Sequence, residues 1–138
     1  MWDVRVISAH DNVVVINNAL SIDLTGQITA ESIGTQLVSS AGGQASFLMR
    51  ALFSKGGRSI TVLPATAKEG TVSRIVPVLA PGTTVTVPRT CADYVVTEFG
   101  IAHLRGKTVR QRAEELIAVA HPDFRSELRK EAQKLYWP

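Results

Sequence analysis

The chain has 138 residues, of which 45% are hydrophobic and 20% charged, a composition that suits a globular protein with a buried core and excludes intrinsic disorder. The net charge of +3 is mild and only 6% of the residues are aromatic, so we expect no nucleic-acid partner. The single cysteine, Cys91, excludes an intrachain disulfide and fits a cytoplasmic protein, and no apolar run is long enough to predict a membrane partner.

The first third of the chain predicts short strands and one helix. Trp2–Ile7 alternates apolar and charged residues without a signal or transit peptide, and we interpret it as a start inside a larger fold. The β-branched run Val13–Ile16 is typical of a strand covered on both faces, and Ser21–Leu24 of a second strand. Ala30–Gly34 predicts a helical turn. Helical spacing of apolar residues over Gln44–Ser54 predicts a helix that the next glycine pair ends.

The rest of the chain predicts strands followed by two helices, which favours an α/β fold. A T-x-x-Q capping box, Thr108 with Gln111, opens a helix over Val109–Val119, and Pro122 lies in the first turn of the last helix. The predicted strands are Ile60–Leu63, Ile75–Leu79, Thr83–Val87 and Tyr94–Thr97, with edges or bulges at Pro77 and Pro88, and Ile101–Lys107 is a predicted turn. The predicted apolar face of the first of these helices consists of Ala113, Leu116, Ile117 and Ala120. That of the last helix consists of Phe124, Leu128 and Leu135.

Three positions carry groups that suit a ligand, and each also has an ordinary structural explanation. Gly43 precedes a helix, where free backbone N–H groups face an anion, but most glycine pairs are only turns. Lys68 lies in a loop beyond a strand, either as a point charge for a phosphate or carboxylate or as a solvated side chain. Glu98 ends an apolar strand, either as an active-site carboxylate or as the ion-pair partner of a nearby arginine, such as Arg105.

The sequence predicts no metal site, because His103 and His121 have no partners at ligand spacing and no C-x-x-C pair exists. The glycine patterns of phosphate-binding and dinucleotide-binding loops are also absent. These spacings indicate no Ser–His–Asp arrangement either.

Five segments together resemble the acetyl-CoA hydrolase/transferase family, which includes the 4-hydroxybutyrate and succinyl-CoA:acetate CoA-transferases. The resemblance runs from about Val13 to about Leu128 and is to the C-terminal domain of that family, so we expect residues 1–138 to form a single domain that is part of it. The combination is specific, although each piece alone is weak. The segments are INNALSIDLTGQITAESIG, AGGQASF, PATAKEGTVSRIVP, DYVVTEFGIAHLRGK and AHPDFR.

The resemblance implies the class I CoA-transferase fold, an α/β three-layer half-domain with a mixed sheet and flanking helices. It also implies an enzyme that moves CoA from an acyl-CoA, acetyl-CoA foremost, to a carboxylic acid or water through a glutamyl-CoA thioester. The family's nucleophilic glutamate lies upstream of the region matching Met1, so we expect this chain alone to be inactive. No cofactor is implied, since coenzyme A is part of the substrate.

The resemblance also assigns roles to residues. Gly43 matches the family's oxyanion-stabilising, CoA-contacting glycine, Lys68 a CoA-binding position, and Glu98 an acidic residue of the acyl or carboxylate pocket that is not the nucleophile. Ser46 and His103 each replace an aspartate of the family. Neither change removes Gly43 or Lys68, so the two changes bear on the choice of substrate and not on membership of the family.

Two roles stay open at this point. The chain is either the C-terminal part of one long enzyme or a non-catalytic interaction subunit that pairs with a chain bearing the nucleophile. The expected partners are acyl-CoA, small carboxylic acids and the missing N-terminal half of the enzyme. An apolar interface left exposed also favours a homo-oligomer.

Overall fold

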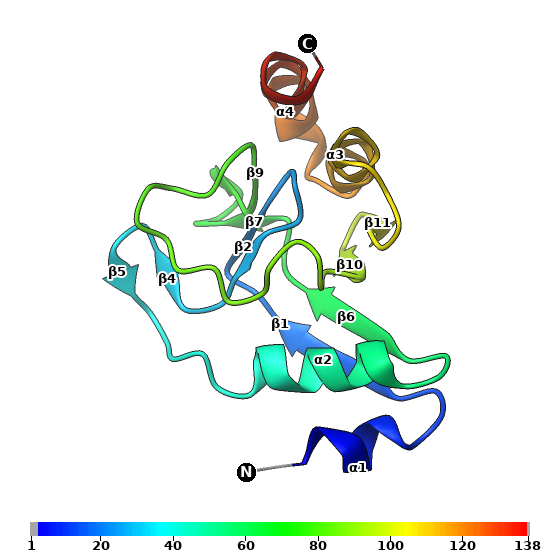
Figure 1. Cartoon of the computed structure of the whole chain (residues 1–138). Helices are drawn as coiled ribbons and strands as arrows, with labels where there is room; N and C mark the ends of the chain where they lie inside the picture. The colour runs from blue at the N-terminus through cyan, green and yellow to red at the C-terminus, as the bar shows by residue number, and fades with distance from the viewer. Residues whose placement is uncertain (1–2, 138) are drawn as a thin grey trace.

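The computed structural model describes residues 3–137, and Figure 1 shows their arrangement. None of the helices in this range is long and apolar enough to cross a bilayer. The helices are α1 (Val4–Ser8), α2 (Gln44–Phe53), α3 (Val109–Ala118) and α4 (Pro122–Tyr136). The longer strands are β1 (Val14–Asn18), β6 (Arg58–Val62), β10 (Tyr94–Thr97) and β11 (Gly100–His103). The shorter strands are β2 (Ser21–Asp23), β3 (Ile28–Thr29), β4 (Ser32–Ile33), β5 (Gln36–Leu37), β7 (Thr66–Ala67), β8 (Val72–Ser73) and β9 (Ile75–Val76).

The four longer strands form the main sheet in the order β1-β6-β10-β11. β1, β6 and β10 run parallel, and β11 returns antiparallel to β10. A second sheet has the order β3-β2-β9, and β4-β5 and β7-β8 form two small hairpins. The α/β class and the mixed sheet with flanking helices are therefore confirmed.

Helix α2 lies along β1 and β6 and runs opposite to them (Figure 1). The C-terminus of α2 lies beside the start of β1, because the N–H of Asn12, just before β1, donates to the carbonyl of Lys55, just after α2, at 2.8 Å. Ten helical residues span about 15 Å, and a five-residue strand spans about 16 Å. The N-terminus of α2, at Gly43, therefore reaches the edge of the sheet where the parallel strands end.

The main sheet is covered on one face. Ser59, Thr61, Val95 and Ala102 point to that face and are buried. α2 packs over β1 and β6, while α3 contacts β11, and the hydroxyl of Thr97 donates to the backbone carbonyl that follows α3.

The opposite face of the sheet is open. Val14 is 52% exposed, Ile16 64% and Ile101 67%. The prediction that Val13–Ile16 is covered on both faces is therefore wrong for the described residues, because the helices that pack on this sheet lie on its other side.

One hydrophobic core joins the two larger sheets and the C-terminal helices. The capping box of α3 forms as predicted, with Thr108 accepting from the N–H of Gln111 while the Gln111 side chain accepts from the N–H of Thr108. The predicted apolar face of α3 is confirmed, since all four of its residues are buried. In α4, Leu128 is buried but Leu135 is 47% exposed, and Ala132 takes the buried position instead.

Two predicted elements are wrong in the type of structure that they assign. Ala30–Gly34 is not a helical turn but contains β4, which pairs with β5 across a two-residue loop that begins with Gly34 at φ +58°. Thr83–Val87 contains no strand. Instead, the Thr83 hydroxyl accepts from the N–H of Gly34, and Val87 makes a single bridge to Ile28.

Three other segments differ at their boundaries or in type. The strand predicted over Ile75–Leu79 ends at Val76, before Pro77, which has no N–H to donate. The turn predicted over Ile101–Lys107 begins as β11, because Tyr94 to Thr97 pairs with it in a hairpin. The alternating N-terminal segment forms helix α1 from Val4, and its first residue lies outside the described range.

Candidate functional site

The three predicted site residues share the edge of the main sheet where its parallel strands end. Gly43 is the N-cap of α2, whose N-terminus reaches this edge. Lys68 follows β6 by way of β7, and Glu98 directly follows β10. Loops beyond the carboxyl ends of parallel strands are where open α/β sheets bind ligands, and the chain reaches Lys68 and Glu98 beyond the carboxyl ends of β6 and β10.

Gly43 leaves the start of α2 open. No side chain caps this helix, Gly43 is exposed, and the preceding Gly42 has a φ of +54°. Among the described residues no side chain accepts from the first backbone N–H groups of α2, and the helix dipole favours an anion there. A side chain at position 43 would bring its Cβ within 3.1 Å of the Phe47 ring, so glycine keeps the approach clear.

Ser46, at a position where the resemblance implies an aspartate, lies exposed in the first turn of α2. An aspartate there would place a negative charge beside the free amides. Serine leaves this end of the helix uncharged, which favours an anionic ligand.

The Lys68 backbone is strained. Lys68 has a φ of +48° and Glu69 a φ of +56°, both in the left-handed region, and Gly70 follows at +88°. Non-glycine residues adopt this region rarely and at a cost of roughly 1 kcal/mol each. Thr71 holds the turn, because its N–H and its hydroxyl both donate to the carbonyl of Lys68, at 3.2 and 2.7 Å.

This turn forms the tip of the β7-β8 hairpin, so the Lys68 side chain is presented to solvent. It makes no ion pair with any described residue. An apolar hollow of about 190 Å³ lies beside the same hairpin, and Ala67 and Val72 are among its lining residues. The hairpin therefore combines a free cation with an apolar surface.

Glu98 lies at the tip of the β10-β11 hairpin and is exposed. Its Oε2 accepts a hydrogen bond of 2.9 Å from the N–H of Ala65, in the loop that leads to Lys68. The alternative in which Glu98 pairs with a nearby arginine, such as Arg105, is wrong, because Glu98 forms no ion pair with any described residue. One carboxylate oxygen thus anchors the loop.

His103, the second position where the resemblance implies an aspartate, lies in the edge strand β11. Its ring stacks on Tyr94 with 4.5 Å between centroids, and its Nε2 lies 3.3 Å from Oδ1 of the buried Asp93. Its backbone N–H donates to Glu115, which also accepts from Lys107 at 2.5 Å. The hydrogen bond from Lys107 is the main reason that the pKa of Glu115 lies below its ordinary value.

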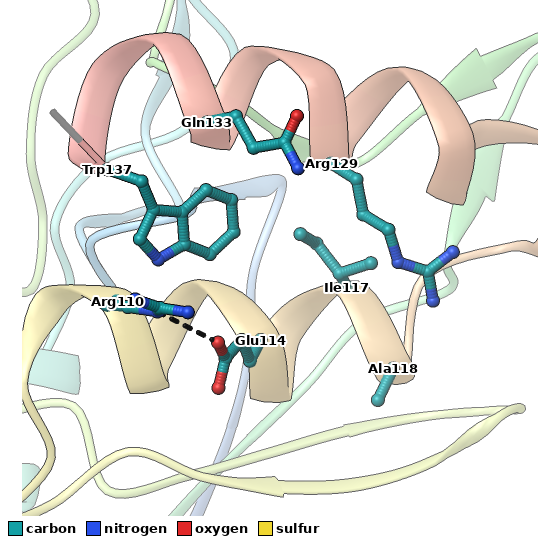
Figure 2. Close-up of a pocket in the computed structure, with 7 residues that line it drawn as sticks. All are labelled: Arg110, Glu114, Ile117, Ala118, Arg129, Gln133 and Trp137. Carbon is teal, nitrogen blue, oxygen red and sulfur yellow. Dashed lines mark hydrogen bonds and ion pairs between the residues drawn. The ribbon is translucent and has the colours of Figure 1, made fainter.

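A cavity of about 450 Å³ lies between α3 and α4 and is lined by none of the predicted site residues (Figure 2). Arg110 and Glu114 form an ion pair on its α3 side, and the guanidinium of Arg110 lies 5.3 Å from the Trp137 ring centre. Within residues 3–137 no group of three His, Cys, Asp or Glu side chains is placed to hold a metal ion.

Sequence reasoning missed the residues that position the site. Thr71 fixes the Lys68 turn, and Ala65 holds Glu98 through its backbone. A threonine three residues after Lys68, with a glycine between them, is a local sign of a turn. The Ala65 contact links residues 33 positions apart and has no sequence signal.

The family follows from comparison with known proteins. A family model described as the acetyl-CoA hydrolase/transferase C-terminal domain matches residues 1–132. The chain belongs to this family. The resemblance drawn from the five segments is therefore confirmed.

Two relatives in the family are CoA-transferases by name. The chain is 50% identical over 131 residues to the 4-hydroxybutyrate coenzyme A transferase of Clostridium kluyveri, a match that covers 95% of this chain and 30% of that protein. It is 49% identical over 135 residues to the butyryl-CoA:acetate CoA-transferase of Anaerostipes caccae, covering 96% of this chain and 30% of that one. The chain thus spans about 30% of the length of these relatives.

The fold agrees with solved structures. RipA from Yersinia pestis superimposes with a TM-score of 0.85 at 46% identity, covering 97% of this chain and 28% of that chain. The arrangement of sheets and helices described above therefore occurs within a much longer polypeptide.

Proposed function

We propose that this chain forms the C-terminal part of a CoA-transferase that moves CoA between an acyl-CoA, acetyl-CoA foremost, and a small carboxylic acid. The observation that carries the proposal is the location of three groups at one sheet edge: the free amides of α2, the unpaired ammonium of Lys68 and the anchored carboxylate of Glu98. Membership of the family supports it, as do relatives named for transferring CoA to or from short carboxylic acids.

In the proposed reaction, a glutamate from the part of the protein that this chain does not span attacks the thioester carbonyl. The C–S bond breaks, CoA leaves as a thiolate, and an acyl-glutamyl anhydride remains. The thiolate then attacks the glutamyl carbonyl, which releases the first carboxylate and forms a glutamyl-CoA thioester. A second carboxylate repeats these steps in reverse and leaves as the new acyl-CoA, whereas water takes the place of that acid in a hydrolase.

Each residue at the edge has a role in this scheme. The Gly43 region donates N–H groups to the negative oxygen that develops on the attacked carbonyl. Lys68 binds a phosphate of CoA as a point charge, beside the apolar hollow of its hairpin. Glu98 lines the acyl or carboxylate pocket, and its anchoring to the Ala65 N–H suits a wall of the pocket better than a mobile nucleophile.

The alternative is a non-catalytic interaction subunit of the same fold. The relatives carry the matching segment inside one polypeptide that is more than three times as long, since it makes up 30% of each. This favours the interpretation of the chain as part of one long enzyme over its interpretation as a separate subunit.

The proposal is tested in a chimera in which this chain replaces the matching segment of the Clostridium kluyveri enzyme. We expect CoA transfer from acetyl-CoA to 4-hydroxybutyrate, and Lys68→Gly should raise KM for acetyl-CoA about tenfold or more through loss of a charged contact. Glycine is chosen because it relieves the left-handed backbone, so a loss of function does not reflect a loss of fold.

Lys55→Ala, which removes a lysine from the opposite edge of the sheet, is the matched control and should leave KM unchanged. The isolated chain should show no turnover. Turnover by the isolated chain that Glu98→Ala abolishes would contradict an upstream nucleophile and would make Glu98 the attacking group.

A further inference from the structure

The tip of the β10-β11 hairpin, which carries Glu98, is fixed against the segment that joins α3 to α4. The Thr97 hydroxyl donates to the carbonyl of Val119 at 2.6 Å and accepts from the N–H of Phe99 at 3.0 Å. Gly100 has a φ of +139°, and a Cβ at this position would lie 3.6 Å from Cγ1 of Val119. The residues before and after the tip are therefore both in contact with the segment between the two helices.

The Phe99 side chain, next to Glu98, contacts two residues at the start of α4. The His121 ring meets it edge to face, with 5.1 Å between the ring centres and an angle of 87° between the planes. The guanidinium carbon of Arg125 lies 5.8 Å from the centre of the Phe99 ring. Edge-to-face ring pairs and cation–π contacts are both favourable. Phe99 is still 38% exposed, so these directed contacts hold the ring more than burial does.

His121 and Arg125 are themselves fixed by the backbone at the start of α4. His121 is the N-cap of this helix, and its Nδ1 accepts from the N–H of Asp123 at 3.3 Å. The Nε of Arg125 donates to the carbonyl of Ala120 at 2.9 Å. Side chains that a helix terminus orients in this way can hold a neighbouring loop in one place. Both residues belong to AHPDFR, a family segment that contains none of the three predicted site residues.

Glu98 is also held by a second segment. Its Oε2 accepts from the N–H of Ala65 at 2.9 Å, and within residues 3–137 no group donates to its Oε1. One oxygen thus orients the carboxylate, while the other is available to a ligand. The position of Oε1 depends both on the loop after β6 and on the contacts of the adjacent Phe99 with α4.

We propose that His121 and Arg125 are positioning residues for Glu98 and that they act through the Phe99 ring. The inference rests on the proposed function, in which Glu98 lines the acyl or carboxylate pocket. A carboxylic acid that enters this pocket as its anion repels the Glu98 carboxylate, because like charges repel. A hairpin tip held by one hydrogen bond would turn away from that anion, and the contacts of Phe99 oppose this movement.

A double-mutant cycle in the Clostridium kluyveri chimera tests the positioning role. Phe99→Leu keeps an apolar side chain but removes both directed ring contacts, and it should lower kcat/KM for 4-hydroxybutyrate about fivefold or more. In the Glu98→Gln background the same change should cost less than about twofold, because the carboxylate that Phe99 positions is already absent. A contribution to general stability alone would give the same factor in both backgrounds.

Three further variants identify the contacts responsible. Phe99→Tyr keeps the ring and should stay within about twofold of the unsubstituted chimera. Arg125→Ala removes the cation and should lower kcat/KM about threefold. Arg129→Ala, one turn farther along α4, is the matched control and should leave kcat/KM unchanged, because that exposed arginine lines the cavity between α3 and α4.

Hydrogen exchange of the Ala65 amide reports on Glu98 without any need for activity. Because this N–H is bonded to Oε2 of Glu98, loosening of the hairpin tip should expose it to water. We expect Phe99→Leu and Arg125→Ala each to speed its exchange about threefold or more in this chain, as followed by NMR. The hydrogen-bonded N–H of the buried Ile22 should be unaffected and controls for general unfolding.

Unchanged exchange at Ala65 in both variants would overturn the proposal, as would equal factors in the two backgrounds of the cycle. An inactive chimera, with Ala65 exchange that still rises in the variants, contradicts the proposed activity and leaves the positioning of Glu98 standing. An active chimera in which Phe99→Leu and Arg125→Ala behave like Arg129→Ala does the reverse.

Discussion

Two residues beyond the carboxyl end of β6 have backbone conformations that lower the stability of the folded chain. Lys68 and Glu69 adopt left-handed backbone conformations that these residues rarely take. Strain of this kind persists where surrounding contacts impose it, here the two hydrogen bonds from Thr71, and it is common at binding sites. The same edge carries an exposed glutamate whose carboxylate holds a backbone N–H. These features favour function over packing as the reason for this geometry.

Glu115 gives a prediction about acid stability at the residue scale. Because the Lys107 hydrogen bond keeps its pKa lower in the folded chain than in the unfolded chain, the unfolded chain takes up the proton first as pH falls. The stabilisation is present above the ordinary pKa of glutamate, about 4.3, and is lost below it. Glu115 is partly exposed, so we expect Glu115→Gln to cost less than about 1 kcal/mol at pH 7.

Urea unfolding at pH 7 and pH 3.5 measures this effect. The difference between wild type and Glu115→Gln should shrink at the lower pH, while Glu127→Gln, on the exposed side of α4, should show no such change. A difference that grows toward low pH would refute the assigned role of Lys107.

At the scale of elements, local signals determined the helices well and the short strands poorly. α2, α3 and α4 begin within a residue of the predicted positions, because glycine, a capping box and a proline mark helix starts. The missed strands β3, β4, β5, β7 and β8 have two residues each and lie in short hairpins. A two-residue strand is too short to show the alternation of apolar and polar residues that marks a strand.

The capping box of α3 yields a prediction for this element. Thr108→Ala removes the acceptor for the Gln111 N–H and should lower the free energy of unfolding by about 1 kcal/mol. Thr108→Ser keeps the hydroxyl and should recover most of that loss. Chemical denaturation of the three proteins checks this, and equal losses for alanine and serine would rule out the cap as the cause.

At the scale of the whole molecule, one core connects parts that form separate sheets. Ile22, in β2, and Val95, in β10, are fully buried members of the same cluster. The chain should therefore unfold in one cooperative step, although its sheets share no strand.

Ile22→Ala tests this cooperativity. Truncating a fully buried isoleucine should cost about 2–5 kcal/mol, and it should move the urea midpoints of far-UV circular dichroism and tryptophan fluorescence together. Separate midpoints, with only one of them shifted, would mean that the β3-β2-β9 sheet unfolds independently.

The sequence by itself determined the α/β class, the helices α2, α3 and α4, the strand Tyr94–Thr97 and, through five segments, the family. These depend on periodicity, caps and motifs that neighbouring residues specify. Only the tertiary structure decided that Glu98 holds Ala65 instead of Arg105, that Lys68 sits in a strained turn, and that one sheet face stays open. Such features depend on contacts between distant segments and on the side of the sheet on which the helices pack.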